Sequence, residues 1–268
     1  MFTIFYEPST RTRLSFAAAG AHLGMQVTGT ENAGKFSSAI KGESLEDSIR
    51  VLCEYCPDVI VLRHDKAGAA ERAAMVAGPN TFIVNAGDGD GQHPTQALLD
   101  LYTISQEKGR LEDLTVVMGG DLANGRTVRS LAYLLSKFDG VRLVFVSPAE
   151  LSMKEDIKAH LNEHKIDFQE EASLEAALRA ADVVYWTRIQ RERIQDENLY
   201  AKVKDVYRIG PREMDFLKPE AVLMHPLPRV DEIAKEVDND RRAVYFKQTG
   251  YGMFMRMSLL AHLFEVEV

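Results

Sequence analysis

The stretch LTVVMGGDLANGRTVRSLAYLLSKF, residues 114–138, shows how this chain is built. A short apolar run rich in valine, typical of a buried strand, leads into a glycine-containing loop and then into a helical pattern. The same order recurs on both sides, from the apolar run at residues 2–6 to the closing helical pattern at residues 251–264. Short strands separated by helices predict parallel sheets covered on both faces, which is an α/β fold.

Length and charge limit what this chain can be. Its 268 residues suffice for two moderate domains, and a polar, glycine-containing stretch at residues 107–114 predicts the boundary between them. The formal net charge is −8, so a broad electrostatic footprint for nucleic acid is not expected. Any anion must instead be bound by a local cluster of cations. The sequence contains neither a membrane-spanning apolar stretch nor a signal-peptide pattern.

The two cysteines form a CxxC pattern, Cys53 and Cys56. This spacing occurs in redox motifs and in half of a zinc site, but only the isolated His64 lies near enough to add a ligand. We therefore expect ordinary buried thiols. The low cysteine content fits a reducing cytoplasm.

Hydroxyl and guanidinium groups gather where the first helix should begin, in FYEPSTRTR at residues 5–13. Ser9 is a suitable N-cap, but the third residue after it is Thr12, so no capping box closes the helix end. Free backbone N–H groups and the side chains of Thr10 and Arg11 could then bind an anion, phosphate in particular. The alternative is a plain Ser/Thr-rich cap with solvated arginines.

Further polar residues follow directly after predicted strands. Arg63 and His64 end the run DVIVLRH, and His93 with Gln96 follows a glycine-rich loop. In open α/β sheets, ligands bind beyond the carboxyl ends of the strands. These positions are therefore candidates for a binding site.

The second half of the chain carries a set suited to carboxylates. GDLANGRT at residues 120–127 misses the phosphate-loop pattern by one residue, with Arg126 in the place of lysine. A nucleotide triphosphatase is thus an alternative, although arginine suits a carboxylate better. Arg188 and Gln190 follow another strand, and HPLP at residues 225–228 forms a turn whose prolines donate no N–H.

Taken together, FYEPSTRTR, KGES, HPTQ, GDLANGRTVRSL, TRIQRER and HPLPRVDEI resemble the aspartate carbamoyltransferase group of the aspartate/ornithine carbamoyltransferase superfamily. The resemblance implies two parallel-sheet domains with the active site in the cleft between them. The first covers residues 1–107 together with the C-terminal helix at 252–268, and the second covers residues 108–251. It implies transfer of the carbamoyl group of carbamoyl phosphate to L-aspartate, a reaction of de novo pyrimidine biosynthesis, without a metal or organic cofactor. A carbamoyltransferase for another amino acid and a non-catalytic paralogue are the alternatives.

Site residues are carried over from the resemblance position by position. It implies that carbamoyl phosphate is bound by Ser9, Thr10, Arg11, Thr12, Ser37, Arg63, His93, Gln96, Leu227 and Pro228. It implies that aspartate is bound by Lys41, Arg126, Arg188 and Gln190, and that Thr12, Arg63, His93 and Lys41 take part in catalysis. Thr12 and Arg63 would polarise the carbamoyl oxygen.

The resemblance also implies an assembly. Ser37 and Lys41 match a loop that reaches into the site of a neighbouring subunit, so a homotrimer with shared sites is expected, with a regulatory subunit as a possible further partner. Members of the family carry additional helices before the stretch that matches FYEPSTRTR. We therefore expect this chain to lack that segment, and we expect a face of the closing helix to be exposed.

Overall fold

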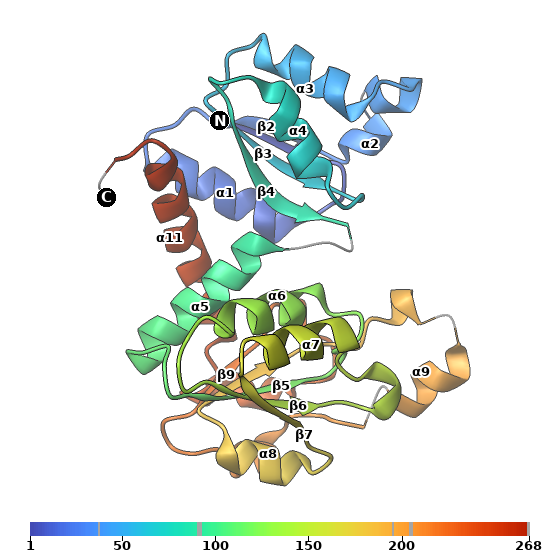
Figure 1. The fold of residues 1–268 in the computed structure, drawn as a ribbon, viewed down its shortest axis with the longest axis vertical. Helices are drawn as coiled ribbons and strands as arrows, with labels where there is room; N and C mark the ends of the chain where they lie inside the picture. The colour runs from blue at the N-terminus through green and yellow to red at the C-terminus, as the bar shows by residue number, and fades with distance from the viewer. Residues whose placement is uncertain (37, 90–92, 195, 204–205, 267–268) are drawn as a thin grey trace. The chain divides into compact units, whose positions relative to one another are not determined.

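The computed structural model describes residues 1–268 except 37, 90–92, 195, 204–205 and 267–268. The chain divides into two compact units, each described here by itself (Figure 1). The first comprises Met1–Leu99 and Gly250–Val268, and the second comprises Asp100–Thr249. The sequence placed the boundaries at residues 107 and 251. In the structure both divisions lie a few residues earlier in the sequence than predicted. Each lies inside a continuous helix, α5 (Pro94–Lys108) or α11 (Tyr245–Leu263).

The first unit is built on a four-stranded parallel sheet with the order β2-β1-β3-β4. Its strands are β1 (Phe2–Phe5), β2 (Thr28–Glu31), β3 (Val59–His64) and β4 (Phe82–Asp88). Its helices are α1 (Thr10–His22), α2 (Ala33–Phe36), the 3-10 helix η1 (Ser38–Lys41), α3 (Leu45–Cys53) and α4 (Ala69–Ala77), with parts of α5 and α11.

The central strand β3 explains why this sheet is covered on both faces. Val59 and Val61 pack with Phe16 of α1 and Leu260 of α11, whereas Ile60 packs on the other face in the cluster of α3 and α4. Side chains alternate between faces along a strand, so an unbroken apolar run must bury both faces. The continuous apolar run that predicted a parallel sheet therefore matches the observed packing.

The second unit has a five-stranded parallel sheet with the order β7-β6-β5-β8-β9. Its strands are β5 (Thr115–Gly119), β6 (Arg142–Val146), β7 (Asp167–Glu170), β8 (Val183–Trp186) and β9 (Val222–Met224). Its helices are α6 (Arg126–Leu135), η2 (Ala149–Leu151), α7 (Glu155–Glu163), α8 (Leu174–Ala180), η3 (Arg191–Arg193), α9 (Glu197–Val203), α10 (Pro211–Met214) and η4 (Lys235–Asn239).

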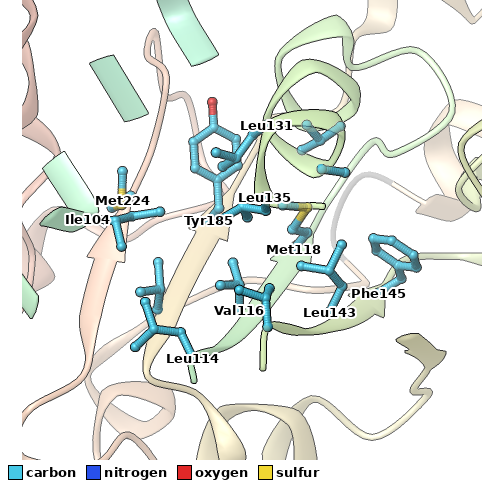
Figure 2. Close-up of a cluster of buried hydrophobic side chains, with 14 of the residues drawn as sticks. Ile104, Leu114, Val116, Met118, Leu131, Leu135, Leu143, Phe145, Tyr185 and Met224 are labelled. Atoms are coloured by element: carbon cyan, nitrogen blue, oxygen red, sulfur yellow. The ribbon is translucent and has the colours of Figure 1, made fainter. Parts of the chain in front are cut away.

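Two apolar clusters fix this sheet between its helices. On one face, Val116, Met118 and Tyr185 pack against Leu131 and Leu135 of α6 (Figure 2). The alternate residues of the same strands pack on the other face against α8 and α10. The residues of both clusters are almost completely buried, so the loops at the carboxyl ends of β5, β8 and β9 start from a closely packed base.

The closing helix α11 is covered along one face, where Leu260 is buried and Met253 and Met257 pack against the cluster of α1. Phe254 of the same helix is 52% exposed, in agreement with the expected exposed face. One expectation needs correction. Cys56 is exposed instead of buried, because α3 ends at Cys53 and the chain turns there. No helix in the described part of the chain is long and apolar enough to cross a bilayer.

Candidate active site

The first turn of α1 presents polar groups directly after β1. Ser9 occupies the N-cap position, and its hydroxyl donates to Thr12 Oγ1 over 3.0 Å. Within the described residues the Ser9 side chain makes no capping bond, as the sequence predicted. Thr12 is buried, whereas Thr10 and Arg11 are exposed. An anion at this helix end would meet backbone N–H groups and the positive end of the helix dipole.

Arg63 is a buried cation near the end of β3, with only 6% of its surface exposed. Its guanidinium donates to the Ala86 carbonyl over 3.2 Å and to the Glu7 carboxylate over 3.0 Å. Parallel pairing of β1 with β3 sets Phe5 opposite Arg63, which brings Glu7 and the start of α1 to the same sheet edge. The register of β1 and β3 therefore places the guanidinium of Arg63 at the carboxyl end of the sheet, near the start of α1.

His93 joins this group from the segment after β4. Its Nε2 lies 3.2 Å from Nη1 of Arg63. A guanidinium can only donate, so Nε2 accepts, and the proton of the neutral ring lies on Nδ1. Gly87 has a φ of +121°, and a Cβ there would lie 3.2 Å from Arg63 Nη1 and 3.7 Å from the His93 ring. Only glycine allows this close approach without strain.

Gln96 lies next to His93, whereas His64 contacts other residues. Gln96 is half-buried in the first turn of α5, and its backbone N–H donates to the His93 carbonyl over 3.0 Å. The ring of His64, by contrast, packs against that of Tyr6 at an interplanar angle of 38°, and its Nδ1 accepts the Lys66 N–H over 3.0 Å. Burial lowers the pKa of His64, so its ring is neutral at pH 7. The structure thus assigns Arg63, and not His64, to the group around His93.

In the second unit, Asp121 holds the loop between β5 and α6. Its fully buried carboxylate accepts the backbone N–H of Asn124 over 3.0 Å and that of Gln190 over 3.2 Å. Because β5 pairs with β8, the segments that follow these strands are neighbours. Asp121 therefore ties the loop that leads to Arg126 to the segment that carries Arg188 and Gln190.

Glycine is required where this loop leaves the sheet. Gly120 has a φ of +99°, and a Cβ there would lie 2.0 Å from the Thr187 carbonyl oxygen. Arg126 is the first residue of α6 and follows the N-cap Gly125. Arg126, like Arg188 and Gln190, is half-buried. Guanidinium groups at such positions suit bidentate binding of carboxylates.

The HPLP segment is fixed by a buried histidine–carboxylate pair. His225 directly follows β9, accepts the Leu227 N–H at Nδ1 over 2.8 Å and donates from Nε2 to Glu232 over 2.8 Å. The Gln248 side chain accepts the His225 N–H over 3.1 Å. Burial is the largest single influence and raises the pKa of Glu232, but the hydrogen bond and charge of His225 together with backbone N–H donors outweigh it, so the pKa of Glu232 is lowered. The Leu227–Pro228 peptide is cis.

The structure shows contacts between some of the predicted residues and places others on different elements. Arg63 and His93 touch, and residues 9–12 follow their partner Glu7 along the chain. Leu227 and Pro228, predicted to contact the carbamoyl group, lie in the second unit. Lys41 is exposed on η1, and Ser37 lies outside the described residues. The individual roles of these residues in binding stay predictions.

Three acidic positions were not identified from the sequence: Glu7, Asp121 and Glu232. Glu7 comes directly after a strand, and Asp121 is followed by Asn124 in a D-x-x-N turn, so both left local signals. Glu232 left none, because its partner His225 is seven residues away and the two meet only through the HPLP turn.

Two family models match the chain in order. The carbamoyl-phosphate binding domain of aspartate/ornithine carbamoyltransferase matches residues 1–106, and the aspartate/ornithine binding domain matches residues 112–263. Aspartate carbamoyltransferase 3, chloroplastic, of Pisum sativum is 54% identical over 261 residues, 97% of this chain and 66% of its own length. The chain thus spans about two thirds of the length of this plant relative.

Solved structures give the same result. The catalytic subunit of M. jannaschii aspartate transcarbamoylase superposes with a TM-score of 0.90 at 49% identity, covering 98% of this chain and 84% of that one. The Trypanosoma cruzi aspartate transcarbamoylase, in complex with N-(phosphonacetyl)-L-aspartic acid, has a TM-score of 0.88 at 40% identity, with coverages of 97% and 82%. These matches confirm the resemblance and remove the basis for the nucleotide triphosphatase alternative. The chain belongs to the aspartate/ornithine carbamoyltransferase family.

Proposed function

We propose that this chain transfers the carbamoyl group of carbamoyl phosphate to the amine of L-aspartate, giving N-carbamoyl-L-aspartate and phosphate in pyrimidine biosynthesis. One observation carries the proposal: each unit presents arginine at the carboxyl end of its own parallel sheet. The first unit has Arg63 in contact with His93, and the second has Arg126 and Arg188 in segments tied together by Asp121. One phosphorylated and one dicarboxylate substrate match these two sets.

The names of the relatives support aspartate over ornithine. The T. cruzi protein is described in complex with carbamoyl phosphate and aspartate together, and the same protein is described with carbamoyl aspartate and phosphate. Those ligands are the two substrates and the two products of the proposed reaction. The first domain model names carbamoyl phosphate, whereas the second names aspartate or ornithine.

The first unit would bind and activate carbamoyl phosphate. Its phosphate would accept hydrogen bonds from the first turn of α1, where Ser9 leaves the helix end uncapped. Arg63 would donate to the carbamoyl oxygen and stabilise the negative charge that develops there as the carbonyl carbon is attacked. The buried position of Arg63 lowers the local dielectric and so increases the effect of its charge.

The second unit would bind aspartate through Arg126 and Arg188. The neutral amine of aspartate attacks the carbamoyl carbon, the bond to the phosphate oxygen breaks, and the electron pair leaves with phosphate. The amine loses one proton as the C–N bond forms, and the departing phosphate can accept it. This direct transfer needs no covalent intermediate with these side chains. Orientation of the two substrates and neutralisation of their negative charges should therefore supply most of the acceleration.

The test is an assay with carbamoyl phosphate and a panel of acceptors that includes aspartate, ornithine and other amino acids. We expect turnover with aspartate and tight binding of N-(phosphonacetyl)-L-aspartate, which carries both anionic parts. Preference for ornithine would support the carbamoyltransferase alternative. No turnover with any acceptor, in a chain that still binds the analogue, would identify a non-catalytic paralogue.

We further propose a homotrimer in which the exposed Lys41 completes the site of a neighbouring chain. Light scattering should give the mass of three chains. Lys41→Ala and Arg63→Ala variants should each be inactive alone, and mixing them after reversible dissociation should restore part of the activity. A mixture that stays inactive, while each variant forms trimers, would contradict shared sites.

We also propose a reducing compartment, the cytoplasm, as the location of this chain. Both cysteines are free thiols, and Cys56 is exposed. Some relatives are chloroplastic, so microscopy of a tagged full chain is the appropriate measurement.

A further inference from the structure

A cluster of metal-binding side chains lies at the end of α7, in the sequence HLNEH at residues 160–164. Residues four apart on a helix share one face, so His160 and His164 lie side by side. The ligand atoms of His160, Glu163 and His164 all lie within 4.8 Å of one another. The reaction proposed above uses none of these residues, and α7 lies over the sheet of the second unit (Figure 1).

Hydrogen bonds fix the tautomer of His164. Its Nδ1 lies 2.9 Å from the backbone oxygen of His160. A carbonyl oxygen can only accept, so Nδ1 carries the proton and Nε2 carries the lone pair. Histidines that bind metals commonly donate their other N–H to a backbone carbonyl in this way, which orients the ring and increases its basicity.

The same reasoning applies to His160. Ser136 donates its single hydroxyl hydrogen to the Tyr133 carbonyl over 2.7 Å. Its oxygen, 2.9 Å from His160 Nε2, must then accept the N–H of the ring. The lone pair of His160 therefore lies on Nδ1. Both rings keep one nitrogen ready for a cation, and both are held by partners of the kind that surround metal sites.

Packing fixes the ring of His160, whereas the side chains of Glu163 and His164 can adjust. The His160 ring stacks on Tyr133 at a centroid distance of 4.1 Å and an interplanar angle of 18°, and the His164 ring lies 4.1 Å away. His160 is half-buried, whereas Glu163 and His164 are exposed. Zinc–ligand bonds of about 2.0–2.2 Å require a closer set, which rotation of the exposed Glu163 side chain and a small tilt of the His164 ring about its hydrogen-bonded Nδ1 would provide.

We propose that His160, Glu163 and His164 bind one Zn²⁺ ion, with water in the remaining position. Two imidazoles and a carboxylate suit Zn²⁺ and its neighbours Ni²⁺ and Cu²⁺, whereas Mg²⁺ and Ca²⁺ prefer sets made only of oxygen. His-x-x-Glu-His also occurs in a class of zinc peptidases. Here Glu163 is a ligand, and no hydrolysis is proposed. Bound zinc would close the last turn of α7 and stabilise the second unit.

The ammonium group of Lys137 is the nearby charge that opposes the ion. It lies 5.7 Å from the centre of the Tyr133 ring, on which His160 stacks. The carboxylate of Glu163 offsets this charge. Glu163→Gln should therefore weaken zinc binding although it removes no imidazole.

The test is calorimetric titration of the full chain, stripped of metal with a chelator, with ZnCl₂ and separately with MgCl₂. We expect one Zn²⁺ per chain, a higher melting temperature with zinc and no binding of Mg²⁺. His164→Gln should weaken zinc binding at least tenfold, and Ser136→Ala should weaken it by about 10–100-fold because it removes the hydrogen-bond partner of His160. His262→Gln, which changes an exposed histidine on α11, is the matched control and should bind like the wild type.

Absence of zinc binding would overturn the proposal. So would zinc binding that His164→Gln and Glu163→Gln leave unchanged, because the ion would then be bound elsewhere. Both changed residues are exposed, so the variants should fold, and a circular dichroism melt without metal checks this. Turnover of carbamoyl phosphate with aspartate should be the same with and without zinc, so failure here does not affect the proposed reaction.

Discussion

Replacing Arg63 by alanine separates its role in the proposed reaction from its role in the fold. Among the described residues the guanidinium donates to the Ala86 carbonyl, to His93 and to the Glu7 carboxylate. If Arg63 stabilises the developing charge on the carbamoyl oxygen, the rate should fall on the order of 10²–10³-fold. The fold must survive for this loss to be informative.

The stability cost follows from what each partner loses. Ala86 is fully buried and His93 is 5% exposed, so each loses a donor that water does not readily replace, at about 1–3 kcal/mol each. The Glu7 side chain is 34% exposed and rehydrates, so its ion pair contributes less than about 1 kcal/mol. Together these losses amount to about 2–7 kcal/mol. Domains are stable by about 5–15 kcal/mol, so the variant should still fold.

The assay measures N-carbamoylaspartate at saturating substrate together with urea unfolding of the same samples. Arg50→Ala is the control, because Arg50 is exposed and pairs with Asp47 one turn away on α3. It should keep full activity and change the unfolding free energy by less than about 0.5 kcal/mol. A folded Arg63→Ala variant with a rate within threefold of the wild type would refute the role assigned to Arg63.

Three further predictions concern the second unit. Asp121→Asn should raise the KM for aspartate about tenfold and leave the KM for carbamoyl phosphate nearly unchanged, since one buried N–H loses a charged acceptor; equal changes in both constants would argue against it. Glu232 has a lowered pKa in the fold, because the hydrogen bonds from His225 and from backbone N–H groups together outweigh its burial. Its ionised form therefore stabilises the fold above the unfolded pKa of about 4.3. That contribution should be lost as pH falls through the lower folded pKa, so urea unfolding of Glu232→Gln should show a deficit at pH 7 that shrinks towards pH 3. Gly120→Ala should cost about 2–4 kcal/mol in urea unfolding, because a positive φ and a carbonyl contact combine. Gly109→Ala, with a positive φ and open space around it, should cost only about 1–2 kcal/mol.

The pattern of the sequence was sufficient for the class of fold. Val59 to Leu62 form an unbroken apolar run, and such a run can be buried only if both faces of the strand are covered. The same holds for β5, whose alternate residues enter two different clusters. Strands of this kind separated by helices leave a parallel sheet as the consistent arrangement.

Most of the candidate site residues could also be proposed from the sequence, because their positions relative to the predicted strands are local features. The carboxyl ends of parallel strands share one edge, so Arg63, Arg126 and Arg188 were predicted as binding residues from their places at or after the ends of strands. Their binding roles stay predictions. The uncapped start of α1 was predicted likewise, because capping depends on residues only three apart.

Only the tertiary structure decided which of these groups touch and how each is held. The contact of Arg63 with His93 depends on the approach of Gly87, and the separation of Arg63 from the adjacent His64 depends on the packing of Tyr6. Asp121 acts across 69 residues of sequence, and the pair of His160 with Ser136 acts across 24. Such contacts follow from strand register and helix packing. Local sequence preferences carry no information about them, because they act over only a few residues.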